Sequence, residues 1–280
     1  MQIIEGGPIA KKILLSVAKE TSLHKHLPGL AAILVGENEA SKLYVQLKKK
    51  TAQKVGIFFS DYLLPEEMPE EAILEVIDHL NNDEDVDGIL VQLPLPSHIR
   101  TENILGRISP EKDVDGLTKE NAKKQRQQQE SFTCPFPQAI VEIILAHNKE
   151  VSGKSVFVLG NSHEFLESMQ FLLEQLGMKV ISCLFGSQQE KYKSIASCDV
   201  IVSAVGVLGS FPEDRVKDGT LIVDGGIERD EEGKVRGDII SEHFKDRDVT
   251  ISPVPGGVGP ITVACLMKNV LESHKRKNHA

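Results

Sequence analysis

Residues 155–184 read SVFVLGNSHEFLESMQFLLEQLGMKVISCL, and this stretch decides the fold. Its first five residues, 155–159, form an apolar, β-rich run that ends at Gly160. The apolar residues that follow have the spacing of one helix face: Phe165, Leu166, Met169, Leu172, Leu173 and Leu176. Gly177 then stands where a helix-ending glycine is expected, and a second apolar run follows at 179–184. A strand, a helix and a strand in close succession predict parallel strands and an α/β fold.

The same alternation extends along the rest of the chain. Strand-like runs are expected at 30–36, 56–62, 88–93, 199–204, 221–224 and 250–253, and helical patterns at 40–54 and 70–81. The two series are separated by a polar interval at 119–136, in which KKQRQQQE (123–130) has no apolar periodicity.

We therefore predict two domains. The first is an α/β domain of residues 1–120, joined by a C-terminal helix within 261–280, whose last residues, 275–280, we expect to be frayed. The second, 121–260, is expected to be a Rossmann-like domain with a parallel sheet.

Charge and composition argue against several classes of function. The chain has 280 residues, with 32 Lys+Arg against 41 Asp+Glu, and a net charge of −9 argues against a nucleic-acid surface. The longest apolar runs, such as 30–35 and 88–93, are too short to span a bilayer, and the N-terminus has no signal-peptide pattern. The four cysteines lack paired spacing, which is typical of reduced thiols. We expect a cytoplasmic protein without a metal site.

A lysine helix is the first segment with chemical potential. Residues 41–48 read SKLYVQLK, so Tyr44 and Lys48 are four positions apart and share one face of a helix. A tyrosine packed beneath a solvated lysine would give the same pattern. A lysine acts as an acid or base only where burial or a nearby cation lowers its pKa from about 10.4.

Two further segments place polar groups beside apolar strands. In DGILVQLPLP (87–96), Gln92 lies near the C-terminal end of a strand that should otherwise be apolar, so it needs a partner. This edge is also where open α/β proteins place ligands. In PEKDVDG (110–116), Asp115 lies in an acidic loop that could equally be a solvated turn or a helix cap.

The fourth segment, PVPGGVGPIT (253–262), contains glycines that let a backbone approach a ligand closely. In order and spacing, the four segments resemble the signature stretches of the bifunctional methylenetetrahydrofolate dehydrogenase/methenyltetrahydrofolate cyclohydrolase family. The resemblance covers roughly residues 1–272, and QLPLP and PGGVGP are its most specific strings. Stretches 4–6, 28–36, 204–206 and 237–238 agree with it as well.

This resemblance implies a role for each residue of a folate site. Lys48 would be the catalytic lysine, Tyr44 would stack on the folate and Gln92 would orient the lysine. Asp115 would hold the pterin ring through charge-assisted hydrogen bonds. The remaining folate contacts implied are Pro255, Gly256, Gly257 and Thr262. When water adds to the methenyl carbon and the ring opens, a proton must move to nitrogen, and a positioned group suits that transfer.

The resemblance also implies NADP as cofactor, tetrahydrofolate derivatives as partners, a homodimer, and a role in one-carbon metabolism and purine biosynthesis. The cofactor would be held at Gly160, Asn161, Ser162 and Ile227. Here the sequence departs from the family pattern, because Asn161 replaces an arginine, Leu166 a glycine and Ser168 a proline. Asn161 and Glu164 also have the spacing of a capping box, by which a helix satisfies its own amides.

Three functions remain open at this point. The first is the bifunctional enzyme, and the second is a cyclohydrolase with a lost or weakened dehydrogenase. The third is a non-catalytic folate-binding protein, against which the presence of Lys48 argues, since a binder does not need it. A Rossmann dehydrogenase for an unrelated substrate is disfavoured because no G-x-G-x-x-G is present.

Overall fold

The computed structural model describes residues 1–187, 189–230 and 232–279. Contacts divide the chain into two compact units. Unit 1 consists of Met1–Lys11 and Phe136–Thr262, and unit 2 of Lys12–Pro135 and Val263–Ala280. The N-terminal helix α1 (Gly6–Thr21) and the C-terminal helix α8 (Val258–His279) both contribute to the two units.

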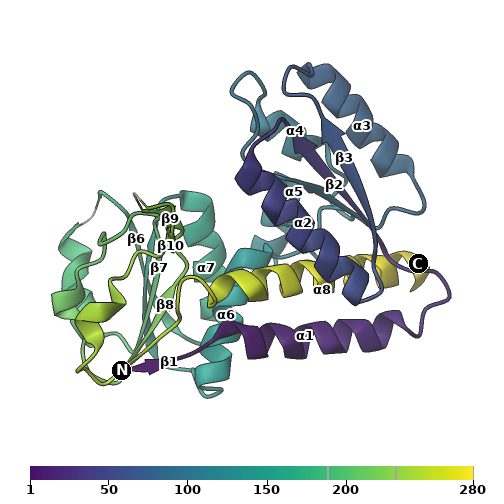
Figure 1. Ribbon diagram of the computed structural model, residues 1–280. Helices are drawn as coiled ribbons and strands as arrows, with labels where there is room; N and C mark the ends of the chain where they lie inside the picture. The colour runs from purple at the N-terminus through teal and green to yellow at the C-terminus, as the bar shows by residue number, and fades with distance from the viewer. Residues whose placement is uncertain (188, 231, 280) are drawn as a thin grey trace. The chain divides into compact units, whose positions relative to one another are not determined.

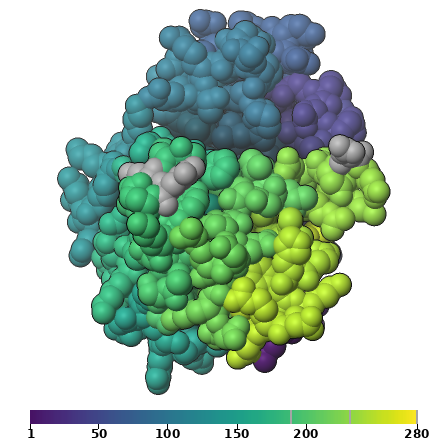
Figure 2. Space-filling view, turned by 90° about the vertical axis from the view of Figure 1, so that its left-hand side faces the viewer, coloured from purple at the N-terminus to yellow at the C-terminus, as the bar shows by residue number. Residues whose placement is uncertain are grey.

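Unit 1 is built on a six-stranded sheet in the order β1-β11-β8-β7-β5-β6, with every neighbouring pair parallel (Figure 1). Its strands are β1 (Gln2–Ile3), β5 (Ser155–Gly160), β6 (Lys179–Leu184), β7 (Val200–Ala204), β8 (Thr220–Asp224) and β11 (Val249–Ile251). The sheet confirms the predicted Rossmann-like architecture. In Figure 2 the first residues (dark purple) emerge beside the yellow part of the chain, as the pairing of β1 with β11 requires.

The other elements of unit 1 surround this sheet. They are the helices α6 (Pro135–His147) and α7 (His163–Gln175), the hairpin of β9 (Glu228–Arg229) and β10 (Val235–Arg236), and the short helices η1 (Gln189–Ser197), η2 (Glu213–Arg215) and η3 (Ser241–Phe244). The core includes Phe157, Ile201, Ile222 and Phe244, all fully buried.

The strand order of unit 1 contains a topological switch point. From β5 the chain passes through α7 to β6 on one side, and it then crosses to β7 on the other side of β5. The loops that follow β5 and β7 therefore diverge at the C-terminal ends of these strands. In open α/β sheets this is where ligands bind.

Unit 2 contains a parallel three-stranded sheet in the order β3-β2-β4. Its elements are β2 (Gly29–Val35), β3 (Phe58–Leu64), β4 (Gly88–Val91), α2 (Glu39–Lys54), α3 (Glu70–Asn82), α4 (Thr101–Arg107) and α5 (Lys119–Arg126). Successive side chains of the central strand β2 point to opposite faces of the sheet, and all of them are buried because both faces are covered. Leu30, Ala32 and Leu34 pack with α2 and α8, whereas Ala31, Ile33 and Val35 pack with α3 and α4.

The C-terminal tail differs from the prediction. Residues 275–279 continue helix α8 instead of fraying. Lys275 forms ion pairs with Glu20 and Glu272, and Arg276 with Glu130, so charged contacts hold the last turns in place. Glu20 and Glu130 are far from the tail in the sequence, so the tail alone does not reveal these two partners.

Among the described residues, no helix is long and apolar enough to cross a membrane, and no group of three potential ligands suggests a metal site.

Candidate functional site

The predicted site residues fall into two groups. Unit 2 contains Tyr44, Lys48, Gln92 and Asp115. Unit 1 contains the others, namely Gly160, Asn161, Ser162, Ile227, Pro255, Gly256, Gly257 and Thr262.

Lys48 and Gln92 meet in unit 2. Helix α2 begins after Asn38, whose side-chain oxygen accepts a hydrogen bond from the Ser41 amide (3.0 Å). From this helix, Lys48 Nζ donates to Gln92 Oε1 at 3.1 Å. The Gln92 Nε2 group donates to the carbonyl of Leu93 (2.8 Å), which turns the amide oxygen towards the lysine. The lysine therefore has a fixed acceptor at the C-terminal end of β4.

The neighbouring groups on α2 have different surroundings. Tyr44 lies one turn before Lys48 and is 42% exposed, so part of its side chain is accessible to a ligand. Lys49 instead donates to both carboxylate oxygens of Asp61 at 2.9 Å. Of these two adjacent lysines, Lys48 points to the end of the sheet and Lys49 to the edge strand β3.

Asp115 lies close to Lys48. Burial raises the pKa of the Asp115 carboxyl, the positive charge of Lys48 lowers it, and the nearby Asp113 raises it further. The Asp115 side chain has no hydrogen-bond partner among the residues that the structure describes, so its oxygens can accept bonds from a ligand. Sequence reasoning placed Asp115 correctly in a loop but left open whether the loop was a cap.

The carboxylate that holds this loop is that of Asp113, which was not identified as important from the sequence. Its carboxylate is buried and accepts hydrogen bonds from the amides of Leu117 (3.1 Å) and Thr118 (2.8 Å) and from Asn121 Nδ2 (2.9 Å). It thus fixes the start of α5, and Asp115 is left for another role. The spacing of an aspartate four and five residues before the bonded amides is the signal that could have identified it.

The glycine-rich loop of unit 1 is held tightly. Gly257 N donates to Pro253 O (2.7 Å), and Gly256 has a φ of +108°, which disfavours any residue with a side chain. Gly6 N donates to Gly256 O (2.8 Å), and a Cβ at Gly6 would lie 1.8 Å from Gly257 O. This contact gives a physical reason for the glycine in the Ile4-Glu-Gly6 stretch.

The expected capping box at the start of α7 is wrong. Ser162, not Asn161, is the N-cap, because Ser162 has the extended backbone of a cap residue and its Oγ accepts from Phe165 N (3.2 Å). Asn161 is exposed, and its Nδ2 donates to Val205 O (2.9 Å), which links the loops after β5 and β7 across the switch point. A capping box that starts at Ser162 would need a glutamate or glutamine three residues later, and that position is occupied by Phe165, not by Glu164.

The N-terminus of α7 fits a dinucleotide phosphate. The amides of His163 and Glu164 have no partner among the described residues, and such amides bind phosphate groups. Ile227 follows β8 and is 52% exposed, which provides an apolar surface for a planar ring. Two features of this site disfavour a phosphate. Glu164 adds negative charge in the first turn of α7. The ring of Phe165 also occupies space beside Gly160, since a Cβ on Gly160 would lie 2.6 Å from this ring.

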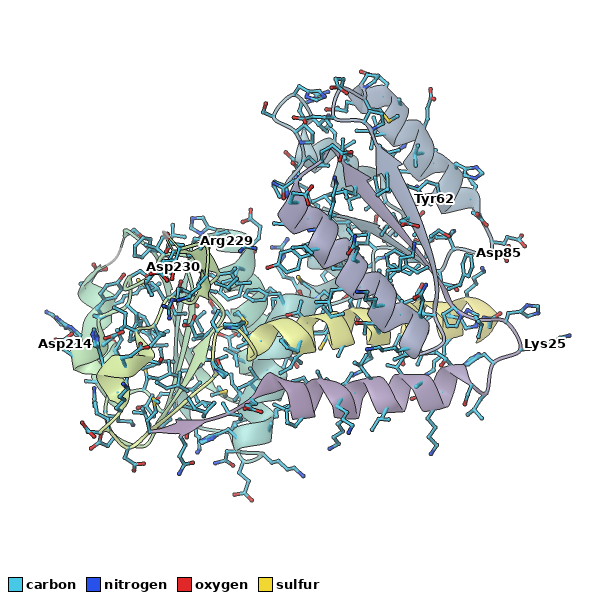
Figure 3. All side chains as sticks on the ribbon, in the orientation of Figure 1. Lys25, Tyr62, Asp85, Asp214, Arg229 and Asp230 are labelled. Atoms are coloured by element: carbon cyan, nitrogen blue, oxygen red, sulfur yellow. The ribbon has the colours of Figure 1, made fainter. Side chains whose placement is uncertain are left out.

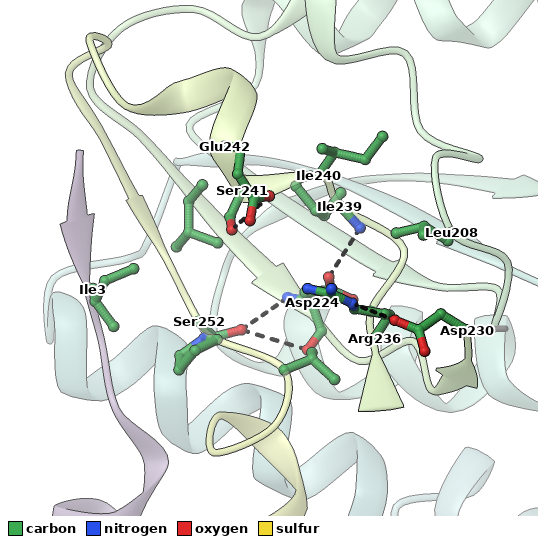
Figure 4. A pocket seen from close by; sticks show the side chains of 14 residues that line it. Ile3, Leu208, Asp224, Asp230, Arg236, Ile239, Ile240, Ser241, Glu242 and Ser252 are labelled. Atoms are coloured by element: carbon green, nitrogen blue, oxygen red, sulfur yellow. Dashed lines mark hydrogen bonds and ion pairs between the residues drawn. The ribbon is translucent and has the colours of Figure 1, made fainter. Parts of the chain in front are cut away.

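A pocket of about 340 Å³ lies elsewhere in unit 1 and contains none of the predicted residues. Asp224 lies in its wall, and Asp230 and Arg236 of the β9–β10 hairpin line it as well (Figure 4). Figure 3 labels Arg229 and Asp230 on the same hairpin. Burial raises the pKa of Asp224 to about 7, although three backbone amides that donate to its carboxylate lower it. Arg236 Nε donates to Asp230 (3.0 Å) within the same pocket.

The fold and the two groups of residues define a two-unit α/β protein with a lysine-centred site in one unit and a dinucleotide-type sheet in the other. Residues 4–115 match the family model of the tetrahydrofolate dehydrogenase/cyclohydrolase catalytic domain. Residues 134–278 match the NAD(P)-binding domain of the same family. The chain belongs to the tetrahydrofolate dehydrogenase/cyclohydrolase family.

Individual relatives are similar to this chain over nearly its full length. The bifunctional protein FolD of Aquifex aeolicus is 41% identical over an alignment of 280 positions. The alignment covers 98% of this chain and 96% of that protein. A crystal structure of the bifunctional enzyme FolD from Campylobacter jejuni is 34% identical, with a TM-score of 0.93 and 99% of each chain covered. The Trypanosoma brucei enzyme, solved with NADP cofactor and inhibitor, is 31% identical with a TM-score of 0.92 and covers 99% of this chain and 98% of that one.

Proposed function

We propose that this protein interconverts methylene-, methenyl- and formyltetrahydrofolate, as an NADP-dependent dehydrogenase and as a cyclohydrolase. The observation that carries the proposal is the cluster of Lys48, Gln92 and Asp115 in the unit that matches the catalytic domain. The name of the Trypanosoma brucei structure, which includes NADP, supports the cofactor.

In the cyclohydrolase step, water adds to the methenyl carbon, a carbon–nitrogen bond of the ring breaks, and one proton is released overall. The proposed role of Lys48 is to move the proton between the adding water and the leaving nitrogen. Gln92 orients the lysine amine through the 3.1 Å hydrogen bond. Tyr44 stacks on the folate, and Asp115 accepts hydrogen bonds from the pterin, which fixes the methenyl carbon near Lys48.

In the dehydrogenase step, NADP when bound supplies the hydride acceptor. The residues of this chain that would hold it are Gly160, Asn161, Ser162 and Ile227, with the amides at the start of α7 on the phosphates. Pro255, Gly256, Gly257 and Thr262 are proposed as further folate contacts. We assign folate binding to residues 1–120 with the C-terminal helix, and cofactor binding to residues 121–260.

We further propose a homodimer in the cytoplasm that has no membrane or nucleic-acid partner and supplies formyltetrahydrofolate for purine biosynthesis. The unpaired spacing of the four cysteines in the sequence is typical of reduced thiols, which suits a reducing compartment.

Two lysine variants test the proposal. Lys48→Met should lower the rate of methenyltetrahydrofolate hydrolysis by roughly 10²–10⁴-fold, the usual contribution of a positioned acid or base. Lys49→Met is the matched control, because it removes the adjacent lysine of the same helix, whose partner is Asp61, and it should hydrolyse at nearly the normal rate. Near-normal hydrolysis by a folded Lys48→Met protein would remove Lys48 from the mechanism.

A further inference from the structure

Two stretches that resemble the family, 204–206 and 237–238, meet in unit 1 around a buried carboxylate. Asp238 is fully buried (0% exposed). Its Oδ2 accepts hydrogen bonds from Ser203 Oγ (2.6 Å) and Val205 N (2.7 Å). Its Oδ1 accepts from the amides of Gly206 (2.8 Å) and Val207 (3.0 Å).

Three consecutive amides, those of residues 205–207, thus converge on one anion. Such an arrangement of amides is a common binding site for phosphate, and here the chain fills it with its own carboxylate. Gly206 has a φ of +80°, which this turn requires and which residues with side chains rarely adopt. The loop after β7 is therefore fixed in shape.

Asp238 also determines the position of the loop after β8. A Cβ at Gly226 would lie 2.0 Å from Asp238 Oδ1, so the backbone of Gly226 rests against the carboxylate. The amides of Gly226 and Asp238 both donate to Asp224 Oδ1 at 3.0 Å, which ties the two segments together. Gly226 directly precedes Ile227, whose side chain is proposed to contact the cofactor.

We propose that Asp238 is a positioning residue for the dinucleotide. By holding residues 205–207 and Gly226, its carboxylate fixes the loops after β7 and β8 at the ligand-binding edge of the sheet and presents Ile227 to the cofactor. The inference rests on the proposed function of unit 1 as the cofactor unit.

A carboxylate is needed because three of the four partners are backbone amides, which can only donate, while the fourth is the Ser203 hydroxyl. The amide of an asparagine would turn an NH₂ group towards either Ser203 and Val205 or Gly206 and Val207. Asp238→Asn therefore places an NH₂ group against at least one backbone amide, that of Val205 in one orientation or those of Gly206 and Val207 in the other, and the loop must move. We expect the Kd for NADP to rise at least about tenfold.

Asp199→Asn is the matched control. Asp199 belongs to the same unit and also accepts several hydrogen bonds, from Ser155 N (2.9 Å), Ser155 Oγ (3.1 Å) and Lys217 Nζ (2.9 Å). It lies at the beginning of β7, whereas the dinucleotide edge lies at the end of this strand. This variant should be destabilised but should bind NADP with an unchanged Kd.

The experiment is a calorimetric titration of NADP into wild type, Asp238→Asn and Asp199→Asn, together with the dehydrogenase kcat and the KM for NADP. A higher Kd and KM in Asp238→Asn alone, with a smaller change in kcat, is the expected result. An unchanged Kd in a folded Asp238→Asn protein, or an equal rise in Asp199→Asn, would overturn the inference. If wild type fails to bind NADP, the proposed dehydrogenase function falls, and the inference falls with it.

If Asp238→Asn does not fold, Ser203→Ala carries the test. It removes one of the four bonds and keeps the carboxylate, so the Kd should rise by about 2–10-fold. An unchanged Kd in this folded variant would then overturn the inference.

Discussion

Replacing Gln92 by alanine should impair the cyclohydrolase through Lys48. The change removes the acceptor 3.1 Å from Lys48 Nζ and leaves the lysine without its fixed partner in unit 2. A hydrogen bond that involves a charged group contributes about 1.5–3 kcal/mol. At about 1.4 kcal/mol per factor of ten, the hydrolysis rate should fall by roughly 10–150-fold.

The assay is the initial rate of methenyltetrahydrofolate hydrolysis, followed by absorbance over a range of substrate concentrations. Gln46→Ala serves as the control, since Gln46 is an exposed residue of the same helix α2 and receives the same substitution. It should keep the wild-type rate. A rate for Gln92→Ala within about twofold of wild type would refute the orienting role of Gln92.

A double variant separates orientation from other effects. If Gln92 acts only through the lysine, Lys48→Met with Gln92→Ala should be no slower than Lys48→Met alone, because the second change removes nothing further. A multiplicative loss in the double variant would show that Gln92 acts on the substrate independently of Lys48.

Two other predictions follow from buried or partly buried carboxylates. Asp115→Ala should weaken folate binding by about one to two decades, since it forfeits charge-assisted hydrogen bonds of roughly 1.5–3 kcal/mol; equally tight binding of a substrate or antifolate would contradict the pterin assignment. His274→Ala should destabilise unit 2 by about 1–3 kcal/mol in urea unfolding, because it removes a buried hydrogen bond. His274 Nδ1 lies 2.9 Å from Asp87 Oδ2, and both side chains are buried. Without the imidazole, Asp87 would keep Gly29 N (2.8 Å) and Lys277 Nζ (3.5 Å), with the charge of Lys112 nearby. A loss below about 1 kcal/mol would contradict this estimate.

The α/β architecture was predictable because its signal is local. Apolar runs bounded by glycine and a stripe at the helical period mark β5 and α7 within a single stretch of the sequence. The boundary errors also have local causes. Asn161 and Ser162 are both good cap residues, and spacing does not show which of them adopts the extended backbone that a cap requires.

Contacts between distant residues were less predictable. Gln92 was expected to need a partner, yet Lys48 is 44 positions away and was linked to it only through resemblance to a family. Asp238 is 35 positions from Ser203, and its four donors come from the end of β7 and from the loop that follows it, which has no periodic pattern. The tail of α8 likewise depends on partners such as Glu20, which precede it by most of the chain.

The most direct test of the proposed function follows both reactions in one preparation. Methenyltetrahydrofolate hydrolysis and the formation of NADPH from methylenetetrahydrofolate are recorded separately by absorbance with the purified wild-type protein. We predict that both reactions proceed and that hydrolysis depends on Lys48. Hydrolysis without NADPH formation would contradict the dehydrogenase half of the proposal, and the absence of both reactions would leave a folate-binding protein in place of the bifunctional enzyme.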